Sequence, residues 1–246
     1  MMVVYLALIG LAAGFLLDAL IARLAVPPNG GGATAASPVS DALTAHGAEP
    51  FRGRAESGSL ALTFDTSGAA WARRLLVVCA TAGLFAVIGA RFDQPAHAAI
   101  VAAYVAVLFI CAGTDALAYR VPNVITYPAI AGAVVIAALM PDADLLEALG
   151  GGGLAGGVLL LPSLLTGGRG MGMGDVKLAA FVGLALGFAY VSPALLFMAL
   201  GGGAFAVILL TTGLRKKGEP IPYAPFISAG AIAALLWQGT AFVNAG

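Results

Sequence analysis

Eight apolar runs, each about as long as a bilayer is thick, constrain what this chain can fold into. Because a helix needs about 20 largely apolar residues to cross a membrane, each run predicts one transmembrane helix. Of the 246 residues, 61% are hydrophobic and 10% are charged, whereas soluble domains carry about 25% charged residues. We therefore predict an all-α fold, a polytopic membrane bundle of about eight helices. The predicted helices cover residues 2–24, 74–91, 96–117, 122–140, 145–166, 175–190, 192–213 and 224–243.

Glycines and one short junction add detail to this prediction. Runs of glycine occur within the apolar segments, at 150–153 and at 201–203. In a membrane such glycines favour close contact between helices. The sixth and seventh runs are separated only at Ser192 and Pro193, where we predict a very short turn.

The basic residues lie almost entirely in one set of loops. Eleven of the twelve Lys and Arg residues fall in odd-numbered loops, and Arg91 is the exception. Because cytoplasmic loops carry an excess of Lys and Arg, the odd-numbered loops are predicted to be cytoplasmic and both termini to lie outside. The net charge of zero argues against a nucleic-acid partner.

The chain divides into three predicted parts. Residues 1–26 form the first transmembrane helix, residues 27–72 a long cytoplasmic loop, and residues 73–246 the membrane domain. The loop begins with a stretch rich in Pro, Gly, Ala and Ser, a composition typical of flexible linkers, and it contains no cysteine. Cys79 and Cys111 both lie within apolar runs, which argues against a disulfide framework or a zinc site with Cys ligands.

Few acidic residues lie near membrane depth, and two of them are predicted to meet. A carboxylate at the centre of a membrane helix costs about 2.5–3.5 kcal/mol of insertion free energy, so each such residue is expected to have a structural or functional role. Asp115 lies at the cytoplasmic end of the third run, and Asp175 opens the sixth. The chain crosses the membrane twice between them, which predicts that both lie at the cytoplasmic face as neighbours. Asp18, near the end of the first run, is instead predicted to be a structural polar anchor.

Paired carboxylates at such a position are typical of aspartic proteases. Two carboxylates held close cannot both ionise easily, so the pair shares one proton. The ionised member takes a proton from water as the water attacks a peptide carbonyl, and the protonated member donates to the carbonyl oxygen. The reaction requires no metal and no cofactor. Gly170, Gly172 and Gly174, which precede Asp175, leave room for a substrate backbone.

Other interpretations of the aspartates remain open. A single acid at a membrane edge is often an interface residue, and Asp175 suits the first turn of a helix, where the helix dipole favours negative charge. A proton- or cation-coupled transporter that uses the paired aspartates is an alternative function, for which inverted repeats and helices broken at mid-membrane would be expected. We find no such repeat, and both aspartates lie at one face. A third possibility is a catalytically silent assembly factor.

Residues near the aspartates are predicted to shape the site. Pro122 and Asn123 break the chain after the third run, and Pro222 and Pro225 form a rigid segment before the last helix. We expect these four residues to line the cytoplasmic opening. Lys177, two positions beyond the second aspartate, points to a different side of its helix and pairs there with an acid or a lipid phosphate, or serves as a basic anchor at the membrane surface.

Three motifs occur in a defined order along the chain. The first is TDALAYRVPNVITYP at 114–128, the second is MGMGDVKLAA at 171–180, and the third is EPIPYAPFISAGA at 219–231. Together they resemble the type IV prepilin peptidases, a family of bacterial membrane aspartic proteases with a GxGD motif. A further stretch, GFLLDALIARL at 14–24, resembles the family's N-terminal motif less closely, with Asp18 where Asn is usual.

This resemblance implies an activity, a location and a substrate class. It implies that Asp115 and Asp175 are a catalytic pair at the cytoplasmic face of the bacterial inner membrane. It also implies cleavage of the basic leader of prepilin or pseudopilin precursors, after a Gly and before a hydrophobic helix. Bifunctional members carry two CxxC pairs in the first cytoplasmic loop. Because residues 27–72 contain no cysteine, the resemblance extends neither to zinc binding nor to N-methyltransferase activity.

Overall fold

The computed structural model describes most of the chain, in six segments and one isolated position. The described residues are 1–25, 68–141, 143–165, 167, 171–212, 222–240 and 243–244. Of the predicted loop at 27–72, all but the last five residues lie outside the described residues, as does Gly170.

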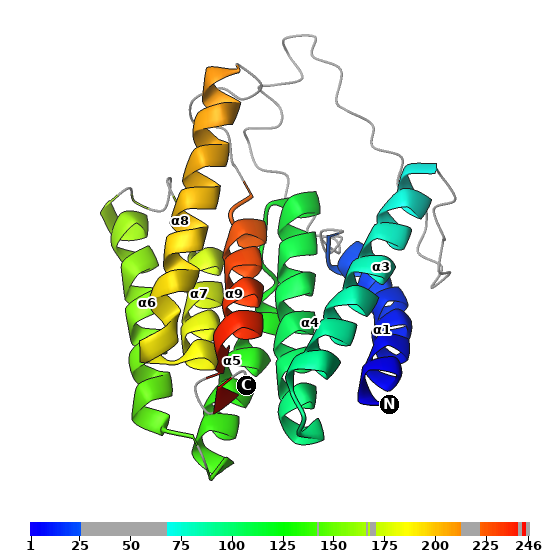
Figure 1. The fold of residues 1–246 in the computed structure, drawn as a ribbon. Helices are drawn as coiled ribbons and strands as arrows, with labels where there is room; N and C mark the ends of the chain where they lie inside the picture. Colours follow the sequence, from blue (N-terminus) through cyan, green and yellow to red (C-terminus); the bar gives the residue numbers. More distant parts are fainter. Residues whose placement is uncertain are drawn as a thin grey trace, which may run out of the picture.

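Helices dominate the described part of the chain and pack side by side into one bundle (Figure 1). The helices are α1 (Met2–Ala25), α3 (Gly68–Arg91), α4 (Pro95–Ala118), α5 (Asn123–Leu139), α6 (Leu145–Leu165), α7 (Met173–Leu186), α8 (Phe188–Thr211) and α9 (Ala224–Gln238). A two-residue antiparallel pair, β1 (Gly239–Thr240) and β2 (Val243–Asn244), follows the last helix. The predicted all-α membrane bundle is confirmed.

The helices are of two lengths. Five are long and apolar enough to cross a membrane: Met2–Ala25, Trp71–Arg91, Pro95–Ala118, Leu145–Leu165 and Phe188–Phe205. The other three, α5, α7 and α9, have 17, 14 and 15 residues. At 1.5 Å per residue they span about 21–26 Å, less than the hydrocarbon core of about 30 Å. The chain is thus a multi-pass membrane protein, and the count of eight crossings stays a prediction.

The three short helices begin at the same end of the bundle (Figure 1). Each start is fixed by a residue that disfavours helix before it: Pro122 caps α5, Gly172 caps α7, and Pro225 occupies the first turn of α9. Helix α4 ends at this end of the bundle, and the two candidate aspartates lie on α4 and α7. We call this end the carboxylate end.

Two predicted boundaries are wrong. The turn between the sixth and seventh runs lies at Gly187, and Pro193 lies inside α8. Gly187 has φ 77°, a conformation that glycine adopts at little cost, and its N–H closes α7 by donating to the Gly183 carbonyl. Helix α3 begins at Gly68, within the predicted loop, because a Gly-Ala-Ala-Trp stretch extends the helical run toward the N-terminus.

Glycines allow the closest helix contacts. On α1, a Cβ added at Gly14 would lie 2.7 Å from the Val78 Cα of α3. Between α6 and α7, a Cβ at Gly151 would meet the Gly183 carbonyl oxygen, and a Cβ at Gly183 would meet the Gly151 carbonyl oxygen. Gly153 faces open space, so only part of the glycine run at 150–153 serves helix packing.

An ion cluster holds α1 against α3. Asp18 is buried, and its two carboxylate oxygens accept hydrogen bonds from Arg73 Nε at 2.9 Å and Arg74 Nε at 3.2 Å. The polar anchor expected at Asp18 therefore has two cationic partners on the neighbouring helix. Because each arginine keeps part of its side chain exposed, only the carboxylate is fully desolvated.

Asp18→Asn is expected to destabilise the bundle. The substitution keeps the shape of the side chain but removes the charge that both arginines neutralise, a loss of about 1–3 kcal/mol for hydrogen bonds to a buried charged group. Thermal unfolding of the purified protein in detergent should show a lower Tm. Asp93→Asn, at an exposed acid between α3 and α4, is the matched control and should leave Tm unchanged; equal Tm values for the two variants would contradict a structural role for Asp18.

Candidate active site

Asp115 lies in the last turn of α4 and is 5% exposed. The helix ends four residues later at Tyr119, whose φ of 52° places it in the left-handed region. Tyr119 N–H closes the helix by donating to the Asp115 carbonyl at 2.8 Å. A non-glycine residue in the left-handed conformation costs about 1–2 kcal/mol of conformational free energy. The surrounding contacts must offset this cost, and the chain changes direction sharply directly after Asp115.

The carboxylate of Asp115 lies at the start of α9. Its Oδ2 atom accepts a hydrogen bond from the Ala224 N–H at 3.0 Å, and Ala224 is the first residue of that helix. The first N–H groups of a helix have no partner within the helix and carry its positive dipole end. Asp115 therefore joins the end of one helix to the beginning of another that is 109 residues away in the sequence.

Asp175 is the second buried carboxylate at this end. It lies in the first turn of α7 and is 9% exposed. Its N–H donates to the Gly172 carbonyl at 3.1 Å in this first turn. Its Oδ1 atom is buried, and no residue in the described part of the chain offers it a hydrogen bond. The structure thus has both aspartates that the sequence singled out at the carboxylate end of the bundle, Asp115 where α4 ends and Asp175 where α7 begins.

The two glycines of the GxGD sequence that the structure describes have different surroundings. A Cβ at Gly174 would lie 3.0 Å from the Val121 Cβ, so the turn that follows α4 packs against the first turn of α7 at this point. A Cβ at Gly172 would make an ordinary contact, 3.5 Å from Asp175 Oδ2. Gly174 therefore has a packing role, and Gly172 borders the carboxylate.

A buried serine fixes the segment that leads into α7. Ser163 lies near the end of α6, and its hydroxyl donates to the Met171 carbonyl at 3.0 Å. This contact places the backbone immediately before Gly172. Ser163 was not among the residues predicted to shape the site, although a polar residue near the end of an apolar run is the same signal that pointed to the aspartates.

Lys177 links α7 to α5. Its Nζ atom donates to Asn123 Oδ1 at 3.0 Å and lies 4.6 Å from the centre of the Tyr127 ring. The expected acidic partner is not what this lysine contacts; the partners are a neutral amide and an aromatic face, a favourable arrangement for an ammonium group. Lys177 and Asn123 thereby hold the starts of these two helices together.

The prolines predicted to shape the site lie at the carboxylate end. Pro122 precedes α5 and its carbonyl accepts the Thr126 hydroxyl at 3.2 Å, while Pro225 lies in the first turn of α9. Pro222 is half-buried just before that helix.

The described basic residues are concentrated at the carboxylate end. Among described residues, Arg91 alone lies at the opposite end, where it donates to the Leu236 carbonyl. The basic residues at the carboxylate end are Arg23, Arg73, Arg74, Arg120 and Lys177. The side of the bundle that contains the aspartates is thus also its basic side.

The fold and the site define a class: a multi-pass membrane protein with two buried carboxylates at one end of an all-α bundle. Residues 102–207 match the model of the type IV leader peptidase family. The matched region contains both Asp115 and Asp175. No solved structure matches the chain.

Three relatives named prepilin leader peptidase/N-methyltransferase are similar to parts of the chain. The Bacillus subtilis protein is 35% identical over 162 residues, which cover 64% of this chain and 63% of that protein. The Burkholderia pseudomallei protein is 39% identical over 85 residues, covering 35% of this chain and 27% of the relative. The Pseudomonas aeruginosa protein is 38% identical over 80 residues, covering 32% and 28% respectively. The chain thus spans less than two thirds of the length of these relatives.

Gly174→Ala is expected to destabilise the carboxylate end. The new methyl group would press on Val121, and overpacking of this kind costs about 1–3 kcal/mol. For a protein of this size each kcal/mol lowers Tm by about 2–4 °C, which thermal unfolding in detergent can measure. Gly172→Ala, whose methyl group would make only an ordinary contact, is the control and should leave Tm unchanged. A Tm for Gly174→Ala equal to that of the parent would contradict a packing role for Gly174, because the turn at Val121 would then move aside without a measurable loss of stability.

Proposed function

We propose that the chain is a membrane aspartic endopeptidase that removes the basic leader of type IV prepilin-like precursors. Cleavage takes place at the cytoplasmic membrane face, after a Gly and before a hydrophobic segment. The observation that carries the proposal is the buried aspartate pair, Asp115 and Asp175, within the residues that match the leader peptidase family. The names of the relatives, prepilin leader peptidase/N-methyltransferase, support the substrate class.

The contacts of the two aspartates support different roles. Asp115 accepts a hydrogen bond from Ala224 N–H at the positive end of α9, a contact that stabilises its ionised form. Asp175 has a buried oxygen without a partner among the described residues, and a protonated carboxyl can donate there to an incoming carbonyl. Asp115 then takes a proton from the attacking water as the new carbon–oxygen bond forms. The proton of Asp175 goes to the carbonyl oxygen. As the carbon–nitrogen bond then breaks, Asp115 returns a proton to the leaving amine, and Asp175 regains its proton from a hydroxyl of the tetrahedral intermediate.

The charge distribution supports a cytoplasmic site. Five of the six described Lys and Arg residues lie at the carboxylate end, and cytoplasmic loops carry the excess of basic residues in membrane proteins. In this orientation the start of α1 and the end of α9 lie outside the cytoplasm. The lipid bilayer and the precursor protein are the partners that the proposal requires.

The transporter alternative receives less support. Coupling sites in transporters lie near the middle of the membrane, at breaks within helices. Asp115 is in the last turn of α4 and Asp175 is in the first turn of α7. Both carboxylates therefore lie near helix ends.

Asp115→Asn and Asp175→Asn should each abolish cleavage. Either substitution removes one of the two proton-transfer groups while preserving side-chain shape, and such groups contribute about 10²–10⁴-fold to rate. The assay is co-expression with a type IV prepilin, followed by mass spectrometry of the mature N-terminus. Asp93→Asn is the control acid and should cleave like the parent. Retained activity in either aspartate variant, with the protein present in the membrane, would contradict the proposed pair.

The rate of cleavage should fall at high pH. A pair that shares one proton loses its general acid when that proton dissociates, and it loses its general base when both members are protonated at low pH. The rate should therefore pass through a maximum when it is measured against pH with purified protein and precursor in detergent. A rate that stays constant well above neutral pH would argue against a shared proton.

A further inference from the structure

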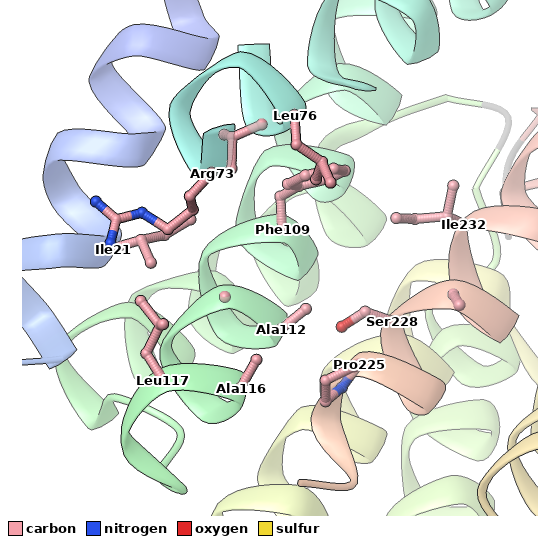
Figure 2. A pocket seen from close by; sticks show the side chains of 13 residues that line it. Ile21, Arg73, Leu76, Phe109, Ala112, Ala116, Leu117, Pro225, Ser228 and Ile232 are labelled. Atoms are coloured by element: carbon pink, nitrogen blue, oxygen red, sulfur yellow. The ribbon is translucent and has the colours of Figure 1, made fainter. Parts of the chain in front are cut away.

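An apolar groove lies beside the candidate active site. It has a volume of about 360 Å³ and separates the α1–α3 pair from α9, with α4 as its floor (Figure 2). We call it the α3–α9 groove. Its lining includes Leu76 of α3, Ala112, Ala116 and Leu117 of α4, and Pro225 and Ala229 of α9.

The lining of the groove selects an apolar occupant. Arg73 and Ser228 are the polar side chains among its lining residues, and both have partners. Ser228 donates its hydroxyl to the Leu108 carbonyl at 3.0 Å, and Arg73 is bonded to Asp18. Figure 2 shows the Arg73 side chain extending toward Ile21, away from α9. An occupant thus meets mainly carbon atoms.

Small residues form the part of the floor between Phe109 and Leu117 of α4. Ala112 and Ala116 are separated by one helical turn there, and Ala229 of α9 also lines the groove. Small residues on a membrane helix allow the backbone of a second helix to approach closely. The large side chains of an approaching apolar helix can then enter the groove.

The groove ends next to the aspartate pair. Leu117 and Pro225 both line the groove, Leu117 is two residues beyond Asp115, and Pro225 follows Ala224, whose N–H is 3.0 Å from Asp115 Oδ2. The groove therefore borders the junction between α4 and the start of α9, which the hydrogen bond from Ala224 N–H to Asp115 holds together. An extended chain advances about 3.3 Å per residue, so a few residues suffice to connect the groove with the carboxylate.

We propose that the α3–α9 groove receives the apolar segment of the precursor that directly follows the cleaved bond. This inference rests on the proposed function. Such a segment is covalently joined to the peptide bond at the aspartates, which explains why an apolar groove ends beside them. Occupation of the groove positions the scissile bond and selects precursors in which a hydrophobic helix follows the cleavage point.

Site-specific photo-crosslinking tests the occupant. Leu76 and Leu75 are neighbours on α3 and are similarly exposed, at 67% and 60%, but only Leu76 lines the groove. The photoreactive residue benzoylphenylalanine replaces one or the other in the full chain, in membranes that contain a type IV prepilin. Mass spectrometry should locate the adducts of position 76 in the first turns of the precursor's apolar segment. Position 75 should give adducts mainly with lipid.

Two results of that experiment would overturn the groove as a docking site. One is an adduct of position 76 with lipid alone or with another part of the same chain. The other is an adduct of position 76 with the basic leader. Because cleavage by the unsubstituted chain is measured separately, the two proposals fail in different ways. Cleavage with lipid-only adducts overturns the docking site alone, and adducts in the apolar segment without cleavage overturn the proposed activity alone.

A substitution that fills the groove tests the docking site independently, through the kinetics of cleavage. Leu76→Trp should lower kcat/KM for the full precursor by about tenfold or more, which is the usual effect of a changed apolar contact in a substrate pocket. Leu75→Trp is the matched control and should cleave like the parent. Thermal unfolding confirms that both variants are folded. A Leu76→Trp variant with unchanged kcat/KM would overturn the docking site.

Discussion

The pairing of buried carboxylates with the N-termini of short helices is the interaction on which this end of the bundle depends. Within hydrocarbon, a backbone N–H without a partner is costly, and an ionised carboxylate without a partner is far more so. Asp115 accepts the first N–H of α9, and Asp175 lies in the first turn of α7. Each helix dipole stabilises negative charge at the place where the chain has an aspartate. The same contacts that end and begin helices therefore allow two acids to lie close together.

The short lengths of α5, α7 and α9 leave room at the carboxylate end of the bundle. Because α5, α7 and α9 span less than the thickness of the hydrocarbon core, their first turns need not reach the membrane surface when their other ends do. Non-helical backbone, such as the turn around Val121, then lies among the helix ends that surround Asp115. Irregular backbone at membrane depth is tolerated where it is buried in protein or lines a cavity. A recessed end of this kind suits a reaction that requires water and a peptide chain within a membrane protein.

The sequence predicted the helices and the common end at which the two aspartates lie, but not the contacts that support the aspartates. Hydropathy located the apolar runs, and counting the crossings between Asp115 and Asp175 placed both at one end. The junction at Gly187 was missed because its signal is a backbone conformation, whereas Pro193 is a conspicuous residue that an α-helix can still contain near its start. The partners of Asp18 were missed as well, since Arg73 and Arg74 lie beyond a loop of more than 40 residues. Distance along the chain concealed both contacts.

The glycines before Asp175 show how one motif can serve two purposes. Their sequence suggested room for a substrate, yet Gly174 is filled by the chain itself, since Val121 lies where its side chain would be. That contact holds the turn after α4 against the first turn of α7; Asp115 lies just before that turn, at the end of α4, and Asp175 lies in the first turn of α7. Gly172, which borders the Asp175 carboxylate, is the glycine that leaves space beside an acidic oxygen. A single short motif thus packs the end of α4 against the start of α7 through one glycine and leaves room beside an acidic oxygen through the other.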